Sequence, residues 1–301
     1  MERLHFDDQI AKNKIKSIVL MGIIVIFFLI LGYIIASIYN PAAFFSIMII
    51  SIIVSMIYIV VSYYNSDKIA LSSVSAKPAS LTEHRVLFHA VESMSLASGL
   101  PMPKVYVMES EQINAFASGR NPQNAVICFT TGALKKLNKQ ELEGVVAHEM
   151  GHIANFDIRF MTLTAVLVGM ISIVAEIFLR SLWFSNNSRG RDGRAQLILI
   201  ILGVLFAILA PIVAQLVSLA ISRKREFTAD ATAVKFTRYS PGLKSALLKI
   251  KNEHISSEDK HHYAKAMAPL FISNPFTRKS ISGLFSTHPP IDERIKRLDA
   301  M

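Results

Sequence analysis

Long apolar runs alternate with polar segments along this chain, and the first two runs lie near its start. Residues 18–38 contain no charged side chain, and after the break at Asn40-Pro41 residues 42–63 contain none either. Each run is long enough for a helix to cross a hydrocarbon core of roughly 30 Å. The alternative of a cleavable signal peptide fits less well because a second run follows at once. We therefore predict an N-terminal transmembrane hairpin in residues 1–64.

Two further apolar runs, 161–183 and 197–221, lie in the second half of the chain. The first run carries Glu176 and Arg180, a pair one helical turn apart that is costly in lipid even if it neutralises itself. The loop between the runs, 184–196, is rich in arginine, which opposes the usual placement of positive charge if both runs span. Two models stay open: a second pair of spans, or a helical hairpin that packs on the polar domain or in the membrane interface.

Basic residues border the apolar runs and predict how the chain is oriented. Lysines precede the first run at positions 12, 14 and 16, and Arg223-Lys224-Arg225 follows the last run directly. Both clusters are typical of cytoplasmic flanks, so we expect a multi-pass protein of the plasma membrane whose polar domain faces the cytoplasm. The single cysteine, Cys128, allows no intrachain disulfide and is compatible with a reducing compartment.

Composition supports a membrane protein with a soluble part. The chain is 52% hydrophobic, only 18% charged, and has a mean hydropathy of +0.41. Its formal charge of +10 would suit nucleic acid, but no basic and aromatic recognition module accompanies it. We therefore expect a lipid bilayer as a partner, and no nucleic acid.

The segment before the third run has the pattern of a mixed α and β domain. A helix is predicted near 81–98, and strands are predicted at 105–108 and 125–130. Between the strands, Asn114-Ala115-Phe116-Ala117 reads as an edge strand leading into a turn. Such an edge either binds an extended substrate as an added strand or is a plain sheet edge, and the pattern favours neither.

The most specific motif follows these strands, at His148-Glu149-Met150-Gly151-His152, which reads H-E-x-x-H. On a helix, positions i and i+4 share a face, so His148 and His152 can bind one cation together. Glu149 lies beside that face, where its carboxylate can act as a general base on a water molecule. Asn138 and Glu141 form a capping box that predicts where this helix starts. An apolar stripe buries its other face: Leu142, Val145, Val146 and Ile153.

A catalytic zinc ion keeps three protein ligands and one position for water. Glu226 is the best third ligand, because a carboxylate together with two imidazoles leaves the ion acidic enough to lower the pKa of bound water. It opens a later helix on which Glu226 and Asp230 share a face. The metzincin pattern is excluded, because it needs Gly and His where this chain has Asn155 and Ile158. A shared ion also requires an even number of membrane crossings between His152 and Glu226, so zero or two are both acceptable.

Taken together, these motifs resemble the HtpX family of membrane-bound zinc metallopeptidases, which are gluzincins related to the CaaX prenyl endopeptidases. The resemblance rests on the early apolar hairpin, on H-E-M-G-H, on R-K-R-E-F-T-A-D and on the final S-T-H-P-P-I-D-E-R-I. It implies a mainly α membrane protein. The N-terminal hairpin would be followed by an α+β zincin-like domain with a small sheet, divided into 65–160 and 223–301 by the two apolar helices of 161–222.

The resemblance also implies residue roles. One Zn²⁺ would be bound by His148, His152 and Glu226, with Glu149 as the general base. Asp230 would orient a ligand histidine. His288 would either donate a hydrogen bond to the oxyanion of the tetrahedral intermediate or make a helix contact with no catalytic part. Members of the family face the cytoplasm and degrade misfolded or surplus membrane proteins, often under stress.

Three other functions compete with this one. An intramembrane protease of the site-2 type also carries H-E-x-x-H, but 138–144 is too polar for a helix inside lipid. A CaaX-type endopeptidase shares the chemistry but cuts prenylated proteins. A membrane scaffold or chaperone with a structural zinc fits poorly, because structural sites are usually closed by a fourth protein ligand.

Overall fold

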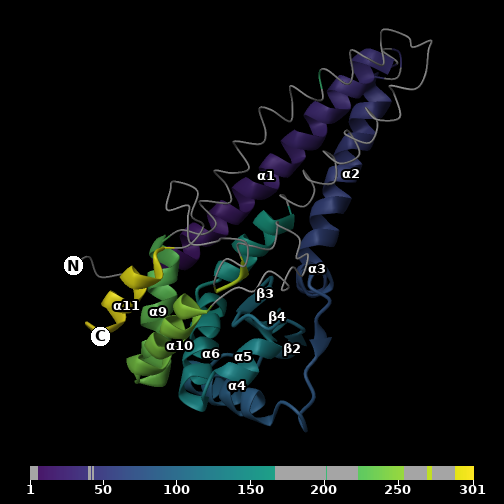
Figure 1. Ribbon diagram of the computed structural model, residues 1–301. Helices are drawn as coiled ribbons and strands as arrows, with labels where there is room; N and C mark the ends of the chain where they lie inside the picture. The colour runs from purple at the N-terminus through teal and green to yellow at the C-terminus, as the bar shows by residue number, and fades with distance from the viewer. Residues whose placement is uncertain are drawn as a thin grey trace.

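The computed structural model is mostly helical, with one small sheet (Figure 1). It describes residues 6–39, 42, 44–166, 201, 223–253, 270–272 and 289–301. The predicted apolar helices of 161–183 and 197–221 lie almost wholly outside these residues. Only the start of the first is described, as part of a helical segment at 157–166.

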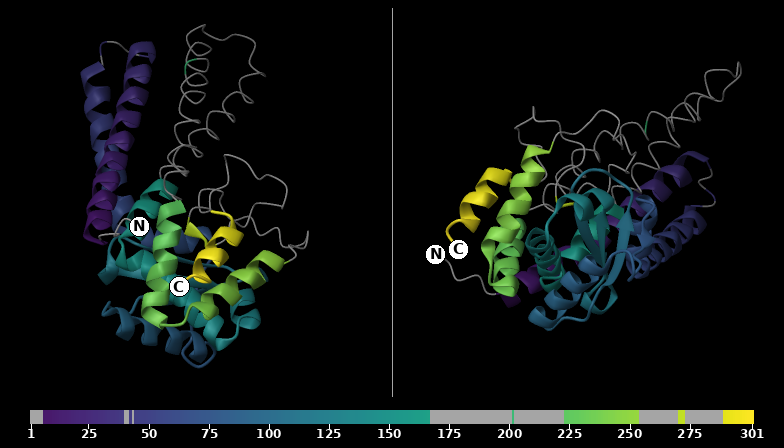
Figure 2. Two further views of the ribbon diagram at one scale, coloured as in Figure 1. Left: turned by 90° about the vertical axis from the view of Figure 1, so that its left-hand side faces the viewer. Right: turned by 60° about the horizontal axis from the view of Figure 1, so that its bottom comes forward.

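Two long helices, α1 (Phe6–Tyr39) and α2 (Phe44–Tyr64), lie side by side and extend away from the rest of the described chain (Figures 1 and 2). They approach closely at Gly32, where a Cβ atom would lie 2.0 Å from Ser51 Oγ. Among the described helices, only α2 is long and apolar enough throughout to cross a membrane, and just 11% of its apolar window is buried. Among the residues of α1 whose side chains are described, Ser17–Ile30 is apolar.

The sheet contains the predicted strands at 105–108 and 125–130. Its order is β1 (Lys77–Pro78), β2 (Lys104–Met108), β4 (Ala125–Thr130) and β3 (Ala115–Gly119). Strands β2 and β4 are parallel, whereas the other two neighbouring pairs are antiparallel. Strand β3 therefore lies at the edge, joined to β4 by a turn that includes the short 3-10 helix η2 (Pro122–Asn124). Strands β2 and β4 were both correctly predicted as short apolar segments with turn residues between them.

Helix α6 (Lys139–Ala154) lies at the centre of the domain. It packs against β3 and α4 (Arg85–Ser98) and, on its other side, against α9 (Arg223–Thr237) and α10 (Ser240–Asn252) (Figure 1). The predicted capping box is present and fixes the start of α6. Asn138 Oδ1 accepts a bond from the Glu141 amide at 2.9 Å, and Glu141 Oε2 accepts one from the Asn138 amide at 2.7 Å.

Close packing around α6 depends on two glycines. A Cβ on Gly144 would lie 2.5 Å from Leu243 N in α10, and one on Gly242 would lie 2.5 Å from Gln140 O. The core around them is apolar and continuous from the sheet to α10, so α6 cannot shift without disrupting its neighbours. The metal-binding motif thus lies on the most constrained helix of the domain.

Three shorter helices complete the described chain. Helix α3 (Ser66–Ser73) follows α2, and α5 (Thr131–Lys136) follows β4. Helix α11 (Ile291–Leu298) lies near the C-terminus. Helix α4 starts at Arg85, later than the predicted 81, because His84 Nδ1 accepts a hydrogen bond from the Ser80 amide and holds this segment as a turn.

Candidate active site

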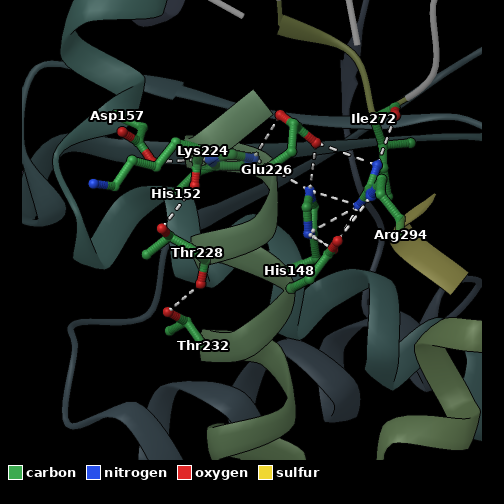
Figure 3. Close-up of polar contacts among 10 residues, drawn as sticks. His148, His152, Asp157, Lys224, Glu226, Thr228, Thr232, Ile272 and Arg294 are labelled. Atoms are coloured by element: carbon green, nitrogen blue, oxygen red, sulfur yellow. Dashed lines mark hydrogen bonds and ion pairs between the residues drawn. The ribbon is translucent and has the colours of Figure 1, made fainter. Parts of the chain in front are cut away.

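Both histidines of the motif are buried on α6, on the side that meets α9. His148 and His152 are 0% and 3% exposed, and their Nε2 atoms lie 3.2 Å apart (Figure 3). The ring planes are almost perpendicular, at 87°. Two nitrogen lone pairs held this close repel each other unless a cation or a proton lies between them.

Glu226, from the first turn of α9, completes a triangle with the two histidines. Its Oε2 lies 3.5 Å from His148 Nε2, and its Oε1 lies 3.5 Å from His152 Nε2. Ligands placed tetrahedrally around a zinc ion at 2.0–2.1 Å would be separated by about 3.3–3.4 Å. The two Nε2 atoms, 3.2 Å apart, are close to this spacing, and each lies 3.5 Å from one of the two Glu226 carboxylate oxygens, so the three side chains can bind an ion of that size.

Helix α9 is regular at this point. Thr228 and Thr232 donate side-chain hydrogen bonds to the carbonyl oxygens of Lys224 and Thr228, each at 2.8 Å (Figure 3). Because these hydroxyls bond within the helix, they leave the Glu226 carboxylate as the polar group of α9 that reaches both histidines. The face shared by Glu226 and Asp230 is thus directed at α6.

Each histidine has a carboxylate at its other ring nitrogen. Asp230 Oδ1 lies 2.9 Å from His148 Nδ1, and Asp157 Oδ2 lies 3.1 Å from His152 Nδ1. These pairs place the proton on Nδ1 and leave Nε2 as a lone-pair donor toward the centre of the site. Asp230 was expected from the sequence to orient a ligand histidine, whereas Asp157 was not, because it follows α6 after a short turn and belongs to no spacing motif.

The electrostatics of His148 reflect these carboxylates. Burial and the neighbouring Arg294 lower the pKa of His148, but the hydrogen bonds to Asp230 and Glu226 outweigh them and raise it to about 9. A metal ligand must be a neutral imidazole, so a metal ion that binds here displaces a proton.

Arg294 is the largest feature that the sequence analysis missed. It reaches in from α11, is 1% exposed, and donates from Nε and Nη2 to the two carboxylate oxygens of Asp230 at 2.9 and 2.6 Å. Its Nη1 lies 3.2 Å from Glu226 Oε2 (Figure 3). The guanidinium holds the pKa of Asp230 low against the effect of burial, and the carboxylates in turn raise the pKa of Arg294. In the sequence, the sign of a buried cation was that residue 294 is basic but shares a helix face with the apolar residues 291, 295 and 298.

Glu149, on α6, is buried close to His148, His152 and Glu226. It is 1% exposed, and its Oε1 has no hydrogen-bond partner within the described part of the chain. Burial raises the pKa of this carboxyl group, which makes it a better proton acceptor than an exposed glutamate. A buried carboxylate with an oxygen open to a further polar group is what a general base for water requires.

Arg225 shows how far the environment of a basic residue can differ from its sequence pattern. It belongs to the basic cluster that was expected to mark a cytoplasmic boundary; its side chain is 5% exposed and its guanidinium lies 4.5 Å from the centre of the Phe160 ring. Burial lowers the pKa of Arg225, whereas Asp157 and Glu226 favour its charged form. It therefore contributes positive charge next to the acidic groups of the site.

The predicted substrate edge is present as β3, but it is not open along its whole length. Asn114, Ala115, Phe116 and Ala117 are all buried. Residues Leu270–Ile272 lie along this edge: the Ile272 amide donates to Ala115 O at 2.9 Å, and Phe271 pairs with Phe116. The two phenylalanine rings meet edge to face, 5.4 Å apart. His288 lies outside the described residues.

Comparison with known proteins places the chain in a family. Residues 81–301 match the model of peptidase family M48. A protein named "Protease HtpX homolog" from Thermoanaerobacter pseudethanolicus is 47% identical over 82% of each chain. Proteins of the same name from Dictyoglomus turgidum and Streptococcus pyogenes are 40% and 38% identical, and the matches cover 96% or more of each chain.

Among solved structures, the crystal structure of S. mikatae Ste24p superposes with a TM-score of 0.52 at 21% identity, covering 97% of this chain and 67% of that one. This likeness shows a shared fold. The family match over most of the chain shows more, and it excludes a non-proteolytic scaffold as the favoured interpretation. This chain belongs to peptidase family M48 and is a membrane-associated metallopeptidase.

Proposed function

We propose that the chain is a zinc-dependent endopeptidase in which His148, His152 and Glu226 bind the ion. One observation carries the proposal: the two Nε2 atoms are 3.2 Å apart and each lies 3.5 Å from one oxygen of the buried Glu226 carboxylate, while a carboxylate contacts the Nδ1 atom of each histidine. Bound there, zinc would supply Lewis-acid polarisation of the scissile carbonyl and would lower the pKa of a water molecule.

Glu149 is the base in this mechanism. Its buried carboxylate takes a proton from the attacking water and delivers it to the leaving amine. The raised pKa suits the first step, because a stronger base accepts the proton more readily. His288 is proposed to donate to the oxyanion, as the sequence motif suggests.

Asp230, Asp157 and Arg294 position the ligands. Asp230 and Asp157 hold the imidazoles in the tautomer that presents Nε2 to the ion. Arg294 neutralises Asp230 and Glu226 and fixes both carboxylates by hydrogen bonds and charge. Because Arg294 comes from α11, the site is complete only when the C-terminal segment is docked.

The substrates are proposed to be extended segments of membrane or misfolded proteins, with the active site facing the cytoplasm. Support comes from the apolar helix α2, from the basic flanks of the apolar runs, and from the position of β3 at a sheet edge beside α6. Since Leu270–Ile272 occupy part of that edge, a substrate strand must continue along β3 beyond them or displace them.

The test is the substitution Glu149→Gln in the full chain, compared with Glu143→Gln one and a half turns earlier on α6, whose side chain is 28% exposed. We expect E149Q to retain one zinc per chain while casein cleavage falls by about 10²- to 10⁴-fold. E143Q should leave both properties unchanged. Normal turnover by E149Q would remove Glu149 from the chemistry, and loss of zinc would make it part of the metal site instead.

A further inference from the structure

Two arginines of the catalytic domain lie over the tyrosines that end α2. The Arg120 guanidinium is 4.5 Å from the centre of the Tyr64 ring, and the Arg159 guanidinium is 5.3 Å from that of Tyr63. Arg120 follows β3, and Arg159 lies in the helical segment after α6, so two separate parts of the domain meet the same helix end. In Figure 1 this end of α2 adjoins α3 and the sheet.

These cations lack the partners that other cations of the domain have. Within the described residues, neither Arg120 nor Arg159 forms an ion pair, and Arg159 Nε is buried with no hydrogen-bond partner. By contrast, Arg294 and Lys249 are each paired with a buried carboxylate. The cation–π contacts orient the two guanidinium groups without neutralising them.

The position of Arg120 and Arg159 at the end of α2 determines which kind of anion can reach them. Tyrosines at the end of a spanning helix lie at the level of the lipid headgroups. Tyr64 is 59% exposed, and Lys68, exposed on α3, adds a third cation nearby in the chain, against one acid in that helix, Asp67. Arginine is suited to phosphate because its planar donors can bind two oxygens at once.

We propose that Arg120 and Arg159 bind the phosphate of an anionic phospholipid headgroup where α2 enters the catalytic domain. The proposal rests on α2 crossing the bilayer, as the proposed function requires, but not on catalysis. The bound lipid would fix the height and tilt of the domain on the membrane, and with them the distance from the bilayer to the β3 edge.

The test uses the full chain in a neutral maltoside detergent, with unfolding followed by a thiol-reactive dye at the buried Cys128. Phosphatidylglycerol, phosphatidylcholine and soluble glycerol phosphate are titrated separately. We expect phosphatidylglycerol to raise the unfolding temperature of the unmodified protein more than phosphatidylcholine does. In the double variant Arg120→Gln/Arg159→Gln, the phosphatidylglycerol concentration for half the effect should rise by about 30-fold.

The matched control is Arg85→Gln/Lys104→Gln, which removes the same charge from exposed positions on α4 and β2. It should respond to lipid like the unmodified protein. The proposal is overturned if the double variant keeps the full phosphatidylglycerol response, which would make the arginines a structural clamp on α2. It is also overturned if glycerol phosphate stabilises the protein equally, since the site would then bind a free phosphate.

Discussion

Replacing Arg294 by Met should destabilise the domain more than any surface change. Arg294 is 1% exposed and contacts Asp230 and Glu226, so the substitution leaves two buried carboxylates next to each other without their cation. Breaking a buried ion pair from one side costs about 3–5 kcal/mol. For a domain of this size, that corresponds to a fall in unfolding temperature of roughly 6–20 °C, measured by dye labelling of Cys128 in metal-free protein.

Arg297 provides the matched control on the same helix. Its side chain is 51% exposed, pairs with Glu293 at 3.2 Å and lies over the Phe227 ring, so Arg297→Met should cost about 1 kcal/mol or less. Added zinc should recover part of the loss in R294M, because the ion restores positive charge beside Glu226. The unfolding temperature of Arg294→Lys should lie between those of R294M and the unmodified protein, since lysine keeps the charge but not the two-point contact with Asp230. Equal effects of R294M and R297M would refute the reasoning.

Two further predictions test the surroundings of the ligands. Asp157→Asn should weaken zinc binding by about 10- to 100-fold, measured by competition with a chromogenic chelator. Asp67→Asn on α3 should leave the zinc affinity unchanged. Equal zinc affinity of the Asp157 variant and the unmodified protein would show that Asp157 does not orient His152. Cys128 is fully buried, and burial raises its pKa, so iodoacetamide should not modify it in the folded protein. After denaturation, iodoacetamide should add one label per chain. Rapid labelling of the native protein would contradict this core packing.

The sequence was most informative where a local pattern has one physical meaning. The capping box at Asn138 and the spacing of His148 and His152 depend only on helix geometry, so the start of α6 and the pairing of the two imidazoles could be predicted without tertiary structure. Strand β4 was equally predictable, because its apolar run is short and bounded by turn residues.

Asp157 and Arg294 were not predictable in the same way. Each acts through a contact between elements that no spacing rule relates: Asp157 reaches back to α6 after a turn, and Arg294 comes from α11. From the sequence alone, a basic residue such as Arg294 near the C-terminus is expected to be exposed to solvent; only the fold shows the two carboxylates beside it. The same holds for Arg225, where a basic cluster marked a membrane boundary but the side chain lies in the interior.

The pairing of Leu270–Ile272 with β3 also depends on tertiary structure. An edge strand can be recognised in a sequence from its position between turns. The sequence does not reveal that a distant segment of the same chain covers that edge. Whether the apolar runs at 161–183 and 197–221 span the bilayer remains a prediction from their length and charge.

The most direct test of the central claim is an X-ray structure of the full chain with anomalous data collected on both sides of the zinc absorption edge. We expect one peak, present only above the edge, within coordination distance of Nε2 of His148, Nε2 of His152 and the Glu226 carboxylate. Absence of a peak there in zinc-loaded, active protein, or a peak bound by other side chains with Glu226 turned away, would contradict the account.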